Sequence, residues 1–186
     1  MKNLTYYIIA LAALLASCTN ADFEYSGYSA YFVFENSAGR SPALASAMNP
    51  ASPGIFCRVC VEGANYFRFE TNQGLSDRVS QNEIDKLRTK NIGLYNATGV
   101  IVGFGNLNMP PTFYAYDSQC PNCYEETGLP RYSLTMNTDG TAECGTCHRK
   151  YDMNNGGLVV SGEHGDKLIR YHASTTGPQG ILSVTN

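Results

Sequence analysis

Hydrophobic and polar positions alternate along most of the chain, and the alternation is that of short β-strands. These segments are rich in aromatic and β-branched residues, and turns containing Gly, Asn, Asp or Pro separate them. The predicted strands are 28–34, 55–61, 66–69, 100–102, 112–116, 132–136, 158–160, 167–172 and 181–184. Their short, regular spacing predicts an all-β fold, an antiparallel sandwich or barrel.

Two stretches of the mature chain depart from this alternation. Ser80-Gln81-Asn82-Glu83 has a capping-box pattern, and Ile84 and Leu87 are three residues apart, so one short surface helix is predicted there. Residues 38–53 are rich in Ala, Ser, Gly and Pro, and we expect them to form a loop.

The first residues have the pattern of an export signal. Lys2 supplies a positive charge, and residues 6–16 form an apolar run that is too short to span a bilayer comfortably. Leu15-Ala16-Ser17-Cys18 then resembles the lipobox of bacterial lipoproteins, in which the Cys is linked to lipid and becomes the mature N-terminus. The alternatives are an ordinary secretory signal with a stray Cys, and a core helix.

The lipobox resemblance implies an organisation and a location. We predict a lipoprotein signal peptide at 1–17, a polar tether at 18–27 lipidated on Cys18 (for example with palmitate), and a single β domain at 28–186. Several acyl chains would anchor the protein stably to a membrane. The expected location is therefore a bacterial membrane, on its periplasmic side or at the cell surface.

Composition excludes several classes of function. The formal net charge is -3, and Lys and Arg are scattered, so no nucleic-acid surface is expected. Three His residues without a convincing nucleophile partner predict no hydrolase triad. Glycines at 99–105 lie in a strand pattern without a following helix or Lys, so they predict no phosphate loop. No catalytic constellation is found, and enzyme activity is not expected.

Two cysteine knuckles carry the candidate chemistry: Cys120-Pro121-Asn122-Cys123 and Cys144-Gly145-Thr146-Cys147. Each Cys-x-x-Cys turn can aim two sulfurs at one point, and two such turns complete a tetrahedron of thiolates. The pattern predicts a metal site on Cys120, Cys123, Cys144 and Cys147.

The segments around the knuckles resemble Rieske iron-sulfur domains. The matching segments are Tyr114-Ala115-Tyr116-Asp117, Tyr151-Asp152, Gly156-Gly157, Leu168-Ile169-Arg170-Tyr171 and Gly180-Ile181-Leu182-Ser183-Val184, in that order. The resemblance covers 93–186 and implies a Rieske-like β domain with two metal-binding loops, preceded by an N-terminal β extension. Cysteines stand where that family has its two His ligands, which lowers the expected potential of any [2Fe–2S] cluster.

Three occupants of the four sulfurs remain open. A closed tetrathiolate site typically holds a structural Zn²⁺, which we favour. A rubredoxin-type iron or a low-potential [2Fe–2S] cluster would instead make an electron-transfer protein with an unknown redox partner. Two disulfides without metal would give a stapled surface binding or assembly module. His148 is a candidate to donate a hydrogen bond to the site, although a solvent-facing side chain is the commoner outcome.

The remaining cysteines and histidines have simpler interpretations. Cys57 and Cys60 lie in a predicted strand, where residues three apart point to opposite faces, so one or both are expected to be small buried hydrophobes. A local disulfide is the alternative, and a thioredoxin-like pair is disfavoured because no helical pattern follows. His164 is expected at a solvated loop tip and His172 on an exposed strand face.

Overall fold

A computed structural model describes residues 24–186 of the protein. The predicted signal peptide and the lipidation of Cys18 lie outside these residues, so both stay predictions. Among the described residues, no helix is both long and apolar enough to cross a membrane.

The described chain is mostly β, as predicted. Its strands are β1 (Tyr31–Glu35), β2 (Phe56–Glu62), β3 (Tyr66–Thr71), β4 (Ser76–Ser80), β5 (Thr89–Asn91), β6 (Val100–Phe104), β7 (Phe113–Asp117), β8 (Leu134–Met136), β9 (Thr141–Cys144), β10 (Lys150–Asp152), β11 (Leu158–Ser161), β12 (His172–Thr175) and β13 (Ile181–Thr185). They form three open antiparallel sheets, and no closed barrel occurs within residues 24–186.

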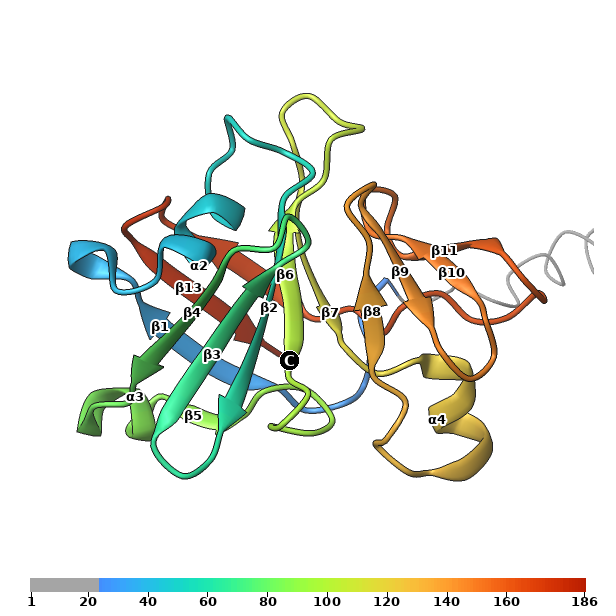
Figure 1. Cartoon of the computed structure of the whole chain (residues 1–186), viewed down its shortest axis with the longest axis horizontal. Helices are drawn as coiled ribbons and strands as arrows, with labels where there is room; N and C mark the ends of the chain where they lie inside the picture. The colour runs from blue at the N-terminus through green and yellow to red at the C-terminus, as the bar shows by residue number, and fades with distance from the viewer. Residues whose placement is uncertain (1–23) are drawn as a thin grey trace, which may run out of the picture.

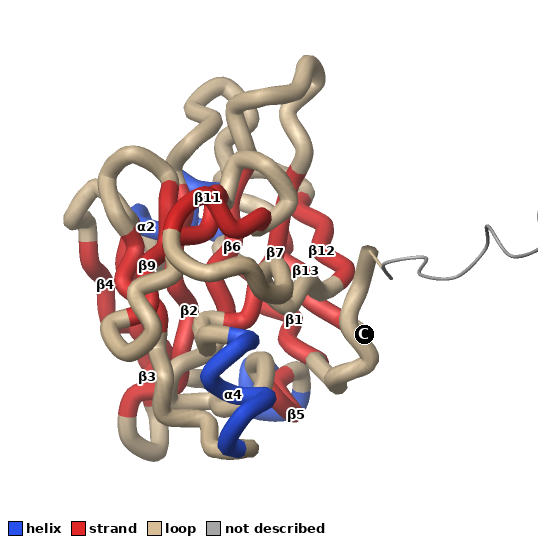
Figure 2. The backbone as a smooth tube through the Cα atoms, turned by 90° about the vertical axis from the view of Figure 1, so that its right-hand side faces the viewer, coloured by secondary structure: helices blue, strands red, loops and turns tan. Residues whose placement is uncertain are grey.

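The three sheets are distinct in order and in place (Figure 1). The central sheet has five strands in the order β4-β3-β2-β6-β7, and the terminal sheet has the order β12-β13-β1-β5. The third sheet, β11-β10-β9-β8, forms with helix α4 (Pro121–Thr127) a small lobe that the chain enters after β7 and leaves before β12. Figure 2 shows this lobe from its own side, in front of the other two sheets.

The central sheet is covered on both faces along β2, β6 and β7, which explains why apolar residues occupy adjacent positions in each of these strands. Successive side chains of a strand point to opposite faces. In β6, Val100 and Val102 enter a core shared with the terminal sheet, whereas Ile101 enters a second core shared with the small lobe. In β7, Ala115 and Tyr116 divide in the same way. The small lobe is therefore packed directly on the body of the domain.

The helices show where the sequence prediction was wrong. Instead of a loop at 38–53, the chain forms a 3-10 turn (η1, Ser37–Gly39) and helix α2 (Pro42–Ala47). The Ser41 hydroxyl caps α2 by accepting the Leu44 N–H, and Pro42 occupies the first turn, where a missing N–H costs nothing. With α4, the described chain has three α-helices rather than one.

The predicted surface helix exists as α3 (Glu83–Leu87), but other residues cap it. Asn82 and Asp85 form the capping box, whereas Ser80 still belongs to β4. Ile84 and Leu87 are exposed, so α3 is surface structure as expected.

Most predicted strands are confirmed, and 55–61 pairs with 66–69 as β2 and β3. The strand predicted at 167–172 is wrong, because only a bridge between Tyr116 and Arg170 forms there and β12 begins at His172. β4, β5, β9 and β10 were not predicted.

Candidate metal centre

The first knuckle lies at the start of a helix rather than in a simple turn. Cys120 is the N-cap of α4 and Pro121 is its first residue. Cys123 follows one helical turn later, so both side chains lie on the same side of the helix start. The Cys120 N–H donates to the Tyr132 carbonyl at 2.8 Å, which fixes the entry to the helix. The first knuckle is therefore formed by the start of a helix, where the sequence analysis expected a turn.

The second knuckle is the turn of a hairpin. Cys144 ends β9, and β10 begins at Lys150. The Cys144 N–H donates to the Arg149 carbonyl at 3.1 Å, and the His148 N–H donates back to the Cys144 carbonyl at 2.9 Å. His148 closes the turn with a φ of +57°. This tight closure brings Cys147 back beside Cys144.

The four knuckle sulfurs form a compact group. All four lie within 4.8 Å of one another. The Cys120–Cys147 sulfur distance is 3.6 Å and the Cys123–Cys144 distance is 3.8 Å. Four sulfurs placed tetrahedrally about 2.3 Å from one ion are about 3.8 Å apart. Cys120, Cys123 and Cys144 are buried and Cys147 is half-buried. The group therefore has the dimensions to hold one metal ion.

The electrostatics of the group favour a bound cation. Burial raises the pKa of Cys120 to about 11, and burial together with the neighbouring sulfurs raises the pKa of Cys123. Burial also acts to raise the pKa of Cys147, but the backbone N–H and guanidinium of Arg149 outweigh it and lower that pKa to about 7. Four crowded thiols cannot all ionise without a positive charge among them, and a metal ion supplies it.

Tyr151 connects the sulfurs to the first knuckle. Its hydroxyl lies 3.2 Å from the Cys120 sulfur and accepts a hydrogen bond from the Asn122 amide at 3.0 Å. Because the amide N–H already occupies the hydroxyl oxygen as an acceptor, the hydroxyl hydrogen is free to donate to the sulfur. Such a donor stabilises a thiolate and orients it.

A single loop, residues 162–166, is held by one residue from each knuckle region. Asn122 donates to the Asp166 carbonyl at 3.0 Å and accepts the Asp166 N–H at 2.9 Å. Arg149 donates to the carbonyls of Glu163 and His164 at 3.0 and 3.1 Å. We call residues 162–166 the clasp loop. A Cβ at Gly165 would collide with the Asn122 amide, so this contact requires glycine.

The other predicted residues lie as follows. His148 is exposed beside the second knuckle, and its donation to the site stays a prediction. His164 is exposed in the clasp loop, and His172 is exposed on β12, as expected. Cys57 and Cys60 are free and buried, and Cys57 belongs to the core under the terminal sheet. The interpretation of this pair as buried small side chains is confirmed.

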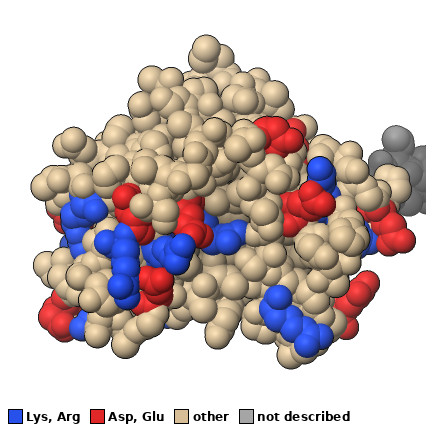
Figure 3. Space-filling view, in the orientation of Figure 1, with Lys and Arg blue, Asp and Glu red and all other residues tan. Residues whose placement is uncertain are grey.

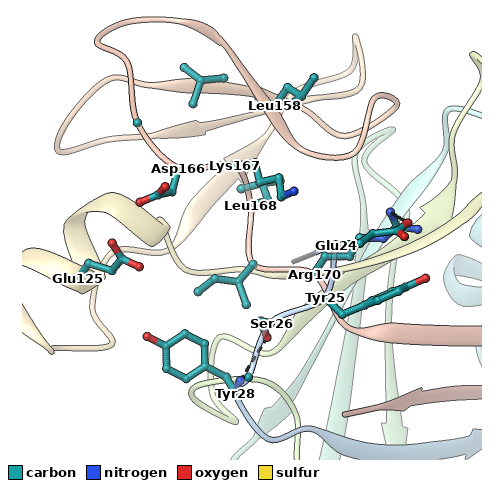
Figure 4. A pocket seen from close by; sticks show the side chains of 14 residues that line it. Glu24, Tyr25, Ser26, Tyr28, Glu125, Leu158, Asp166, Lys167, Leu168 and Arg170 are labelled. Carbon is teal, nitrogen blue, oxygen red and sulfur yellow. Dashed lines mark hydrogen bonds and ion pairs between the residues drawn. The ribbon is translucent and has the colours of Figure 1, made fainter. Parts of the chain in front are cut away.

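A groove lies beside the small lobe, away from the four sulfurs (Figure 4). Its volume is about 790 Å³, and residues 24–28 form one wall. Arg170 pairs with Glu24 at 2.7 Å and lies over the Tyr25 ring. Burial and the nearby Asp166 raise the pKa of Glu125. None of the six cysteines within residues 24–186 lines this groove.

Sequence reasoning missed Tyr151, Asn122 and Arg149 as contacts of the site. Tyr151 had a usable signal, because it is the inward position of the strand that follows the second knuckle and pairs with buried Ala142. Asn122 and Arg149 gave no such signal, since their partners come from the clasp loop, distant in sequence.

In comparisons with known proteins, no family model, no curated protein and no solved structure matches the chain. What stands without such a match is a mostly-β protein with a buried four-cysteine group that can hold a metal ion.

Proposed function

We propose that this chain is an exported, lipid-anchored protein whose Rieske-like β domain holds one structural Zn²⁺ on Cys120, Cys123, Cys144 and Cys147. The observation that carries the proposal is the compactness of the sulfur group, with every sulfur within 4.8 Å of the others. No open coordination position remains once four thiolates surround the ion, which is typical of structural zinc.

The same compactness favours a single ion over a [2Fe–2S] cluster. In such a cluster the four thiolates are divided between two irons, so sulfurs of opposite pairs must lie farther apart than the ligands of one ion. Here no two of the four sulfurs are more than 4.8 Å apart, and the contacts of 3.6 and 3.8 Å run between the knuckles. Both knuckles therefore converge on one point.

A structural role follows from the shortness of the strands in the small lobe. Its strands have only three or four residues each, between Leu134–Met136 and Leu158–Ser161. A metal bound to both knuckles would join the start of α4 to the β9–β10 turn. Because such a site does not exist in the unfolded chain, the binding free energy becomes folding free energy.

The Rieske-like part of the proposal has support from topology and ligand order. The small lobe is inserted between β7 and β12, and its two metal-binding segments lie together at one end of it. Four thiolates in place of two thiolates and two imidazoles remove the ligands that give Rieske clusters their high potential.

Electron transfer by a rubredoxin-type iron is the second candidate, and one observation favours it. Cys147 is half-buried while the other ligands are buried, so one edge of the site is open to solvent. A redox partner would need such an edge. The disulfide-stapled module has less support, because all six described cysteines are free.

Elemental analysis and an absorbance spectrum of protein purified from its own host test the proposal. We expect a colourless protein with about one zinc per chain. Visible absorbance with stoichiometric iron would replace zinc by the electron-transfer candidate, and protein with neither metal would reject both. Heterologous expression is unsuitable, because zinc readily occupies thiolate sites made for iron.

The lipid anchor needs a separate experiment. Radiolabelled palmitate should be incorporated into the wild-type chain and not into Cys18→Ser. Equal labelling of both proteins, or labelling of neither, would reject the anchor without affecting the metal site.

A further inference from the structure

Two loops that project from the same side of the domain carry no charge. One connects α2 to β2 and the other connects β6 to β7, and both extend from the top of the molecule in Figure 1 and again in Figure 2. No Asp, Glu, Lys or Arg occurs in residues 41–57 or 91–116. Figure 3 shows the result, an upper surface without charged side chains apart from an acidic patch toward its right, above a belt of mixed charges. We call residues 49–55 and 104–113 the uncharged cap.

The uncharged cap exposes large apolar side chains at its tip. Met109 is 96% exposed and Leu107 is 60% exposed. Leu87 on α3 is also exposed, at 79%, but Glu83 and Lys86 lie on the same short helix. Single exposed apolar residues are ordinary on a protein surface. The uncharged cap is different because its exposed apolar side chains have no charged neighbours within the two loops.

The base of the uncharged cap is held by hydrogen bonds within and between its two loops and to the small lobe. The Gly54 N–H donates to the Phe104 carbonyl at 2.7 Å, and the Gly105 N–H donates to the Thr112 carbonyl at 2.9 Å. The Asn106 N–H donates to the Asn154 side chain at 3.2 Å. Little conformational entropy is then lost when the tip is buried against another surface.

Some polar groups of the two loops are absent or already have hydrogen-bond partners. Pro50, Pro53, Pro110 and Pro111 have no backbone N–H. The Asn108 amide donates to the Thr112 hydroxyl at 3.3 Å, and the Asn49 side chain accepts the Ala51 N–H at 3.1 Å. Burial of a polar group away from water is costly only when it lacks a hydrogen-bond partner. These paired groups can therefore leave water at low cost.

We infer that the uncharged cap inserts its tip, Leu107 and Met109, into the interfacial layer of a phospholipid bilayer. The absence of Lys and Arg suits electrically neutral, zwitterionic headgroups, since binding to anionic lipids relies on basic side chains. This inference rests on the membrane location in the proposed function and is independent of which metal is bound. A lipid anchor would keep the tip at a high effective concentration near the bilayer, so a weak insertion suffices.

The absence of Trp from the chain gives a direct test. Met109→Trp in the full chain places a sole Trp at the tip, and Leu87→Trp is the matched control on another exposed surface. Both are reconstituted with phosphatidylcholine vesicles, with and without doxyl-labelled lipid. We expect a blue-shifted emission for Met109→Trp and quenching about twofold or more above that of the control, unchanged in 0.5 M salt (about a 4 Å screening length).

The outcomes separate this inference from the proposed function. Protein that sediments with vesicles while the Met109→Trp emission stays water-like and unquenched overturns the insertion of the tip. Equal quenching of Met109→Trp and Leu87→Trp also overturns it, because contact would then be unspecific. If the lipid anchor is absent, neither variant should sediment with the vesicles. If the four-cysteine group holds no metal, the vesicle-bound protein should contain no zinc, and the position of the tip is measured independently of this.

Discussion

The chain contains the Cys-x-x-Cys spacing in two kinds of backbone, and only one of them makes a site. In β2, Cys57 and Cys60 are both buried and free, and only Cys57 belongs to the core under the terminal sheet. At 120–123 and 144–147, a helix start and a hairpin turn bend the backbone, and four sulfurs converge within 4.8 Å. An extended strand alternates its side chains, whereas a turn gathers them. Local curvature, rather than spacing, therefore determines which cysteines can share an ion.

The largest expected difference between the knuckle cysteines and the strand cysteines is in the stability and zinc content of single Ser variants. Cys144→Ser should lose the metal and destabilise the domain by more than about 5 kcal/mol, because structural zinc binding is coupled to folding. Cys57→Ser should keep the metal and cost about 1–3 kcal/mol for a buried hydroxyl. Zinc content and denaturant unfolding of both proteins measure this.

A chelator provides the control for that experiment. It should lower the stability of the wild type and of Cys57→Ser, and leave Cys144→Ser unchanged. Equal stability of the two variants would reject a central role for the four-cysteine group.

Asp117 lies at the end of β7, just before the first knuckle, and tests whether this segment is stabilised independently of the metal. Its carboxylate is fully buried and accepts hydrogen bonds from the N–H groups of Leu94 and Gln119 and from the Tyr171 hydroxyl. Burial raises its pKa from 3.8 to about 6, although these hydrogen bonds pull it down. A carboxyl with a raised folded pKa contributes stability below about pH 4, and that contribution is lost as the pH rises through about 6.

Asp117→Asn should remove this pH dependence. Relative to wild type, the variant should gain about 3 kcal/mol of stability between pH 4 and pH 7, from a pKa shift of about two units. Urea unfolding of both proteins at each pH, compared as a difference, cancels acid release of the metal. Parallel stability curves would show that Asp117 does not titrate in this range.

Tyr151 tests how much the hydrogen bonds around the two knuckles contribute to stability and to retention of the metal. Tyr151→Phe removes the hydroxyl next to the Cys120 sulfur and deprives Asn122 of one acceptor. We expect a loss of about 1 kcal/mol in stability and about tenfold faster transfer of zinc to a competing chelator. Tyr31→Phe, at an exposed position of β1, is the matched control. The same transfer rate in both variants would contradict the role of the hydroxyl.

The sequence predicted the β class and the cysteine group well because both rest on local patterns. Strand alternation in β2 and β3, and the spacing in the two knuckles, can be read without knowledge of distant contacts. Helix α2 was also readable in principle, because Ser41 followed by Pro42 is a helix start. Its composition of Ala, Ser and Pro was instead interpreted as a loop.

The remaining misses have tertiary causes. β4 and β5 are short polar strands that form on the edge of an existing sheet, so their own sequences carry little signal. Asn122 and Arg149 became recognisable only when the fold placed the clasp loop beside both knuckles. Hydrogen bonds between distant segments leave no periodic pattern in a single sequence.

The smallest effect on the metal site, and the sharpest control for the comparison, is expected from replacing both strand cysteines. Cys57→Val with Cys60→Val keeps small apolar side chains in a β-strand, where β-branched residues are favoured. We expect a stability cost of about 1–3 kcal/mol, because each Val adds the volume of about one methyl group to a buried position. Zinc content should be unchanged, since neither residue belongs to the four-cysteine group. Loss of zinc from this double variant would mean that β2 supplies a ligand, and the distinction between straight and curved cysteine pairs would fail.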